Sequence, residues 1–362
     1  MDSSVTPSAP VRRVDPSAIE RELSALWMAE GEVRKQSAEG KTLTRTVLLN
    51  LVIFAPDQAA ADRALAQVVA LTGRQPSRSI LMVADERASD AGLDAWVSLF
   101  CTTPLGGGER VCGEQIVMEA KGPAILDLPG TVLPLLLTNV PTFLWWLVGN
   151  PFAHPIYENL VRAVDRVILD SLTFTQPQTD FADAARHAAD GPAIVTDLGW
   201  ARLAPWRSLI AQVFDPRGMR PYLNDLERVR LTTYTGSPAL AWLFAGWLAS
   251  RLDWRLISQD AQTMRFEGGQ TIEFERDSAG EADRAPGYFA AVHLRTRDSA
   301  TFEVARLPKA CAVTRLNVGG MQTEHVVPVR YDTPADWLGR ELNRLARSAT
   351  FEAAISLISN LG

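Results

Sequence analysis

The sequence of 362 residues contains only three cysteines and four histidines. A small, odd number of cysteines in a long chain does not form a disulfide framework, which excludes the small disulfide-stapled secreted domains. No histidine stands four residues from another histidine or from a cysteine, so the common spacing of zinc ligands is absent. The sequence therefore predicts a protein with no metal site and no cofactor.

The sequence also lacks the motifs of common catalytic and phosphate-binding sites. It has no Gly-x-Ser-x-Gly, Ser-x-x-Lys, Gly-x-x-x-x-Gly-Lys or Gly-x-Gly-x-x-Gly pattern in a suitable context. The glycines at 106–108 come nearest to a phosphate loop, but a strand pattern follows them, which favours a hairpin loop. His293 is expected to be structural, and His154 is a loop residue that could line a site. We predict no catalytic residue and no enzymatic activity.

Neither a long apolar run nor an excess of positive charge is present. The most hydrophobic stretch, residues 132–148, is interrupted by Pro134, Asn139 and Pro141, whereas a spanning helix needs about 20 largely apolar residues. Residues 1–18 lack the apolar segment of a signal peptide. The net charge of −6 disfavours a general nucleic-acid binder. We therefore expect a cytoplasmic protein without a membrane or nucleic-acid partner.

The apolar pattern of the first half predicts an arm, a helix and then a layered domain. Residues 1–40 are expected to form a disordered arm and a helix that begins after Asp15-Pro16. Residues 41–200 begin with a strand, a helix and a second strand, which predicts parallel pairing through a crossover. Further strands alternate with helices, and one helix is expected over 125–137. The prediction for 41–200 is an α/β domain with a mixed sheet.

The second half, residues 201–362, has a different texture and predicts an α+β domain. Gly268-Gly269 lies between two short strand patterns, which is a strong hairpin signal. Four more strand patterns follow with short turns, which favour antiparallel pairing. One terminal helix is expected after Asp332-Thr333-Pro334. The sequence therefore predicts a largely antiparallel sheet with helices on one face.

Three short motifs have compositions that folding alone does not require: Pro76-Ser77-Arg78-Ser79-Ile80, Cys112-Gly113-Glu114-Gln115-Ile116 and Leu144-Trp145-Trp146. Arg78 either anchors an anionic group of a partner or pairs with Glu114 inside the domain. Glu114 and Gln115 are candidates for a buried polar network. Trp145 and Trp146 are adjacent on an expected strand and point to opposite faces, so one is expected in the core and the other is a candidate interface residue.

Cys101 and Cys112 flank the glycine loop and are a candidate redox pair. A disulfide requires Cα atoms about 4.4–6.8 Å apart, which the sequence alone does not determine. The favoured interpretation is two buried thiols that act as small hydrophobic side chains.

In this order, the three motifs resemble the OpcA family, the glucose-6-phosphate dehydrogenase assembly proteins, over roughly residues 40–355. The resemblance implies a non-enzymatic factor that binds glucose-6-phosphate dehydrogenase and favours its active oligomer in the oxidative pentose phosphate pathway. It makes the motif residues candidates for partner binding: Arg78, Cys112, Glu114, Gln115, Trp145 and Trp146. Some family members are linked to thioredoxin-dependent redox control, but only Cys112 of this chain matches a motif.

The residues also leave an alternative open. The α/β pattern, Arg78 and the glycines at 106–108 are compatible with a sugar-phosphate or nucleotide-binding enzyme, or with a sensor that binds an unidentified small metabolite.

Overall fold

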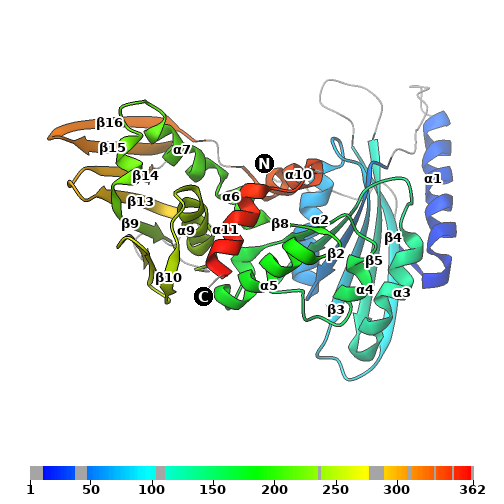
Figure 1. Cartoon of the computed structure of the whole chain (residues 1–362). Coiled ribbons are helices and arrows are strands. Elements are labelled where there is room, and N and C mark those ends of the chain that lie inside the picture. The colour runs from blue at the N-terminus through cyan, green and yellow to red at the C-terminus, as the bar shows by residue number, and fades with distance from the viewer. Residues whose placement is uncertain are drawn as a thin grey trace. The chain divides into compact units, whose positions relative to one another are not determined.

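The computed structural model describes residues 11–36, 47–102, 111–234, 238–276, 289–307, 311–329, 332–344 and 346–359. They form two compact units (Figure 1). Unit 1 contains the chain up to residue 169 together with 192–195 and 334–345, and unit 2 contains 170–191, 196–333 and the chain from 346 onward. Among the described residues, no helix is long and apolar enough to cross a bilayer. Each unit is thus assembled from segments that are distant in the sequence.

A mixed sheet with the strand order β1-β4-β5-β3-β2-β6-β7-β8 forms the first layer. β1 and β4, and β4 and β5, pair antiparallel, whereas β5, β3, β2, β6 and β7 are successive parallel neighbours. The strands are β1 (Arg12–Val14), β2 (Leu49–Ala55), β3 (Ser77–Asp85), β4 (Gly92–Thr102), β5 (Val111–Lys121), β6 (Thr142–Trp146), β7 (Arg166–Leu169) and β8 (Ile194–Asp197).

Six of these strands follow the order of a dinucleotide-binding sheet. Counted along the chain from β2, and leaving out β4, they lie in the order third, second, first, fourth, fifth, sixth. In doubly wound sheets of this order, ligands bind where the order reverses, beyond the carboxyl ends of the strands. That point lies between β2 and β6. The connection from β3 to β5 departs from the common pattern, because it runs through the antiparallel strand β4.

The first strand–helix–strand unit forms where the sequence predicts it. β2 is buried along its whole length, and β3 is buried up to its last residue, as expected for strands covered on both faces. Between them, α2 (Gln58–Leu71) begins after Asp57, whose carboxylate accepts a hydrogen bond from the Ala60 N–H at 2.7 Å. Unit 1 also contains α1 (Ile19–Gln36), which lies along β4 in Figure 1, the short α3 (Leu128–Val132) and α4 (Tyr157–Val161), and α10 (Pro334–Asn343).

The prediction of a continuous helix over residues 125–137 is wrong. The segment consists of a 3₁₀ turn (Gly122–Asp127), the five-residue α3 (Leu128–Val132) and another 3₁₀ turn (Leu133–Leu135). Pro129 and Pro134 explain the breaks, because proline lacks the N–H of a continuous helix and disfavours helical backbone at the preceding residue.

The two ends of the chain also differ from expectation. Residues 12–14 form the edge strand β1, where a disordered arm is predicted. The helix expected after Asp332-Thr333-Pro334 is present as α10 in unit 1, and a second helix that was not predicted, α11 (Ala349–Ser359), follows it in unit 2. Arm and helix patterns are local, whereas edge pairing and helix docking depend on distant residues.

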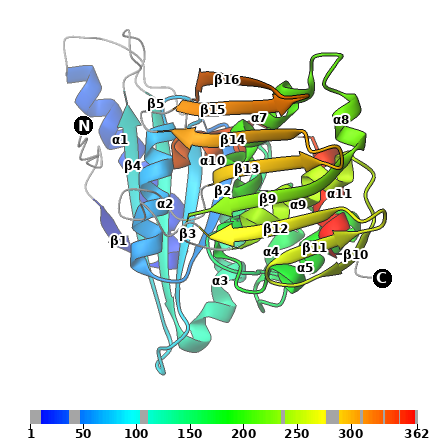
Figure 2. The same ribbon diagram turned by 90° about the vertical axis from the view of Figure 1, so that its left-hand side faces the viewer.

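Unit 2 contains a second eight-stranded sheet, which Figure 2 shows face-on. Its order is β10-β11-β12-β9-β13-β14-β15-β16, and every neighbouring pair is antiparallel except β12 and β9. The strands are β9 (Leu226–Thr233), β10 (Leu256–Gln259), β11 (Thr263–Phe266), β12 (Thr271–Arg276), β13 (Phe289–Thr296), β14 (Thr301–Leu307), β15 (Cys311–Val318) and β16 (Met321–Pro328). The mixed α/β and largely antiparallel α+β fold class is therefore confirmed.

Helices cover one face of this sheet, and no described helix of unit 2 covers the other, which we call the open face (Figures 1 and 2). α9 (Ala239–Arg251) is apolar around almost its whole circumference, which allows it to pack against both α11 and the sheet, where Phe244 meets Phe289 of β13. Gly246 permits that close approach, since a Cβ at this position would lie 2.5 Å from the Ala354 carbonyl oxygen. The other helices of unit 2 are α5 (Pro177–Asp190), α6 (Leu198–Arg202), α7 (Ala204–Phe214) and α8 (Pro221–Asn224).

The hairpin expected at Gly268-Gly269 is confirmed. β11 and β12 pair antiparallel on either side of it, and the two glycines have φ values of 88° and 84°. They lie in the three-residue loop between Phe266 and Gln270, where the Phe266 N–H donates to the Gln270 carbonyl at 3.0 Å, and glycine adopts such left-handed conformations without steric cost.

Candidate functional site

Arg78 is at the centre of a buried ion-pair network in unit 1. Its side chain is 1% exposed, and it lies opposite Glu114 in the parallel register of β3 and β5. Its Nε donates to Glu114 Oε2 at 2.6 Å, and its Nη1 donates to the Leu135 carbonyl at 2.6 Å and to Glu20 of α1. Trp27 of α1 donates its Nε1–H to Glu114 Oε1 at 2.7 Å. Of the two sequence interpretations, Arg78 takes the internal pairing, and the network attaches α1 to the sheet.

The neighbours of this pair are also hydrogen-bonded. The Ser79 hydroxyl donates to the Glu114 carbonyl at 3.0 Å, and the Ser98 hydroxyl donates to Gln115 Oε1 at 3.2 Å. Arg78, Glu114 and Gln115 are all buried. A buried polar group costs free energy unless it is paired, so these bonds make the motif a specific connection between strands.

Both adjacent tryptophans are buried, so neither is the exposed interface residue for which one of them was a candidate. Trp145 and Trp146 are each 2% exposed, because β6 is an interior strand covered on both faces. The Trp146 ring stacks on Phe54 with the centroids 3.9 Å apart, and His154 meets both rings edge-on. Neither tryptophan is an exposed interface anchor in this fold.

Cys101 and Cys112 form a disulfide, so the interpretation as two separate thiols is wrong. They lie directly opposite each other in the antiparallel register of β4 and β5, with their Cα atoms 4.0 Å apart. Glu30 is the third member of a group whose potential ligand atoms lie within 4.8 Å of one another. Zinc ligation by cysteine requires thiolates, and the joined sulfurs do not provide them. The glycines at 106–108 lie outside the described residues.

A cavity of about 910 Å³ opens at the carboxyl ends of β2, β3, β5 and β6, where the strand order reverses. Its wall includes the stacked Phe54 and Trp146, and His154 crosses it to contact Glu86 at 2.9 Å. Asp85, the last residue of β3, also lines it. In dinucleotide-binding folds an acidic residue near this place holds the ribose.

The cavity residues do not fit a dinucleotide pyrophosphate. The turn after β2 reads Pro56-Asp57-Gln58 and contains no glycine, so the backbone cannot approach a pyrophosphate as the glycine-rich fingerprint does. The Asp57 carboxylate already caps the start of α2. A carboxylate at this position repels a phosphate from the helix N-terminus that would otherwise bind it.

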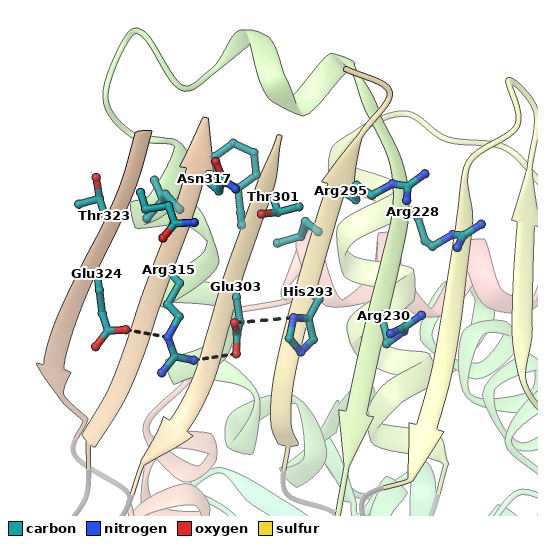
Figure 3. A pocket seen from close by; sticks show the side chains of 14 residues that line it. Arg228, Arg230, His293, Arg295, Thr301, Glu303, Arg315, Asn317, Thr323 and Glu324 are labelled. Atoms are coloured by element: carbon teal, nitrogen blue, oxygen red, sulfur yellow. Dashed lines mark hydrogen bonds and ion pairs between the residues drawn. The ribbon is translucent and has the colours of Figure 1, made fainter. Parts of the chain in front are cut away.

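The open face of the unit 2 sheet carries a second cavity, of about 580 Å³ (Figure 3). Polar and charged side chains of β9, β13, β14, β15 and β16 project from this face. Arg315 is ion-paired with Glu324 at 2.8 Å and with Glu303 at 3.1 Å. The lining residues on these strands are Arg228, Arg230, His293, Leu294, Arg295, Thr301, Phe302, Glu303, Arg315, Leu316, Asn317, Gln322, Thr323 and Glu324.

None of these cavity residues belongs to the three sequence motifs. Only His293 was considered from the sequence, and it was expected to be structural. It projects from the open face with its side chain 46% exposed, and its Nδ1 lies 3.9 Å from Glu303. The available signal was strand alternation: Arg228 and Arg230 flank the buried Val229, and His293 and Arg295 flank the buried Leu294. That pattern places all four side chains on the outward face.

Asp197 is a titratable residue of unit 2 that is buried away from this cavity. Asp197 accepts hydrogen bonds from the Ser171 N–H at 2.8 Å, the Ser171 hydroxyl at 2.7 Å and the N–H groups of Gly199 and Trp200. Burial, followed by the nearby Asp170 carboxylate, raises the pKa of Asp197 to about 6, against the lowering effect of these hydrogen bonds. Because its oxygens already cap α6, we assign Asp197 a structural role.

Both halves of the chain match models of known protein domains. Residues 68–186 match the family model described as the glucose-6-phosphate dehydrogenase subunit N-terminal domain, and residues 193–355 match the corresponding C-terminal domain. Two curated relatives carry the name "Putative OxPP cycle protein OpcA". The Synechocystis protein is 24% identical over 77% of this chain and 62% of its own length, and the Nostoc punctiforme protein is 27% identical over 80% and 65%. The chain thus spans somewhat less than two thirds of these relatives.

Among solved structures, a putative oxidoreductase from Bacillus subtilis is 8% identical, with a TM-score of 0.48 over 86% of this chain and 95% of that chain. A likeness at this level carries no conclusion about activity. The two family models, in contrast, follow each other along most of the sequence. The chain therefore belongs to the OpcA family of glucose-6-phosphate dehydrogenase assembly proteins.

Proposed function

We propose that the chain is a non-enzymatic factor that binds glucose-6-phosphate dehydrogenase and favours its active oligomer. The observation that carries the proposal is the match of both family domain models, over 68–186 and 193–355. The names of the curated relatives support a role in the oxidative pentose phosphate cycle. We further propose that the chain acts in the cytoplasm.

The physical mechanism that we propose is differential binding. A protein that binds the active quaternary state of an enzyme more tightly than the inactive state shifts the population toward the active one. A hundredfold preference corresponds to about 2.7 kcal/mol, which is an ordinary allosteric coupling. No covalent step is required of the chain, in keeping with the absence of a recognised catalytic motif in its sequence.

Within this proposal, the motif residues have an internal role. Arg78, Glu114 and Gln115 are buried, and so are Trp145 and Trp146 of β6. We propose that they maintain the shape of unit 1, and that other, exposed side chains contact the dehydrogenase.

The experiment mixes the purified chain with the dehydrogenase of the same organism. Sedimentation velocity measures the oligomer, and steady-state assays measure kcat and KM, with each protein alone as the control. We expect a larger complex together with a higher kcat or a lower KM. Unchanged sedimentation and unchanged kinetics at saturating chain would overturn the proposal.

A nucleotide-binding or sugar-phosphate enzyme is the second candidate, because the cavity between β2 and β6 lies where doubly wound sheets bind ligands. The Asp57 cap and the glycine-free turn oppose the nucleotide form of it. Calorimetric titration with NAD and NADP distinguishes the two candidates. We expect no binding heat, and saturable binding accompanied by turnover of a substrate would favour the enzyme.

A further inference from the structure

Two arginines face each other across neighbouring strands of unit 2, and a third arginine lies opposite a histidine. In the antiparallel register of β9 and β13, Arg228 lies opposite Arg295, and Arg230 lies opposite His293. The alternation of buried and outward residues places all four on the open face, as Figure 3 shows. Opposite residues of an antiparallel pair have Cβ atoms about 4.5–5.5 Å apart, and like charges at this distance destabilise a sheet. This arrangement concentrates positive charge at one end of the cavity.

The lining of the cavity has an excess of positive charge. It contains four arginines and two glutamates, so the net charge is four minus two, or +2, when His293 is neutral. Both glutamates, Glu303 and Glu324, contact Arg315 at the far end. The arginines of β9 and β13 therefore have no glutamate partner among the lining residues, and their partners lie beside the cavity.

Those three arginines have partners outside the lining that an anion can replace or supplement. Glu273 and Glu275 of β12 and Glu227 of β9 contact them at 3.1–3.4 Å. The arginine side chains are 43–50% exposed. Exposed ion pairs of this kind contribute about 0–1 kcal/mol each, so they do not prevent a ligand from binding the same guanidinium groups.

A phosphate monoester matches this end of the cavity in charge and shape. It carries about −1.5 to −2 at neutral pH and presents three strong acceptor oxygens. Guanidinium groups bind such oxygens through two parallel N–H donors. A single carboxylate has only one negative charge and would neutralise less of the excess.

The other end of the cavity has the chemistry of a hydroxyl-binding surface. The hydroxyl group of Thr301 and the amides of Asn317 and Gln322 line it, and they continue the row of paired residues that begins with Arg228 and Arg295. Such groups both donate and accept hydrogen bonds and carry no charge. The volume of about 580 Å³ lies within the range of small-molecule sites and exceeds what a bare phosphate ion requires.

We propose that the open face of the unit 2 sheet binds a small phosphate monoester that carries hydroxyl groups. Arg228, Arg230 and Arg295 bind the phosphate, with His293 beside them, and the amide and hydroxyl side chains of β14, β15 and β16 bind the hydroxylated part. This site is separate from the cavity between β2 and β6, and it does not depend on the dehydrogenase being the partner.

The test is isothermal titration calorimetry of the full chain at low ionic strength, with glycerol 3-phosphate, inorganic phosphate and glycerol as probes. We expect glycerol 3-phosphate to bind more tightly than inorganic phosphate, and glycerol to give no heat. Arg228→Gln and Arg295→Gln should each weaken glycerol 3-phosphate binding by about tenfold or more, because each removes a charge-assisted hydrogen-bonding group. Arg295→Lys keeps the charge but loses the two-donor geometry and should fall between these variants and the wild type.

Arg265→Gln is the matched control. Arg265 lies on β11 between the buried Met264 and Phe266, so it projects from the same open face without lining the cavity. This variant makes the same change of charge and should alter affinity less than twofold. Circular dichroism checks that each exposed-site variant is folded. The absence of glycerol 3-phosphate binding, or an equal loss in Arg265→Gln, would overturn the site. Equal affinity for inorganic phosphate would overturn its hydroxyl-binding part.

Discussion

Replacing Arg78 by methionine is expected to destabilise unit 1 by about 3–5 kcal/mol, the cost of removing one partner of a buried ion pair. The side chains of Arg78 and Glu114 are 1% and 0% exposed, so water cannot take the place of the lost guanidinium. The substitution also removes the hydrogen bond to the Leu135 carbonyl. Methionine fills a similar apolar volume, so the loss is mainly electrostatic.

The assay is urea unfolding followed by circular dichroism and tryptophan fluorescence, with hydrogen exchange to locate the effect. Because Glu20 and Trp27 tie α1 to the same network, the amides of α1 should exchange faster in the variant. Arg74→Met is the control: its side chain is 66% exposed and lies 3.7 Å from Asp336, so we expect a change of at most about 1 kcal/mol.

A double variant separates the charge from the packing. Arg78→Met combined with Glu114→Leu removes both charges, and it should be less destabilised than the Arg78→Met variant alone, with a residual cost from the Trp27 N–H that loses its acceptor. If Arg78→Met unfolds at the same urea concentration as the wild type and keeps α1 protected, the structural assignment of this motif is refuted. Retained stability with lost dehydrogenase binding would instead favour the partner-anchor interpretation.

Three further predictions concern other positions. The pKa of Asp197 is about 6 in the fold and 3.8 without it, so the folded state retains this proton more strongly, and stability falls as pH rises from about 4 to above 6. The unfolding free energy of the wild type should drop by about 3 kcal/mol relative to Asp197→Asn over that range, measured by urea titration at each pH. Gly246→Ala should cost about 1–3 kcal/mol in a thermal melt, because its Cβ would lie 2.5 Å from the Ala354 carbonyl oxygen; an unchanged midpoint would show that α9 and α11 separate easily. Reducing the disulfide, or replacing Cys101 and Cys112 by serine, should lower stability by about 3 kcal/mol, since the bond closes a loop of 11 residues; equal urea midpoints with and without reductant would contradict this.

Much of the fold follows from local patterns in the sequence. The alternation of apolar residues predicts β2, α2 and β3 because strand and helix periodicity depends only on near neighbours. The hairpin at Gly268-Gly269 follows from backbone conformations that glycine adopts freely. The three motifs identify the family. The motifs do not show, however, that all of their named side chains are buried.

Tertiary structure alone decided which side chains meet. Adjacent strand residues always point to opposite faces, but whether both faces are covered depends on the strand's place in the sheet, and this buried both Trp145 and Trp146. The register of β9 against β13 placed Arg228 opposite Arg295, and the register of β4 against β5 joined Cys101 to Cys112. Periodicity is set by bonded and near-neighbour geometry, whereas strand order and register are set by packing between distant segments, so a single sequence determines the first directly and the second only through the folded whole.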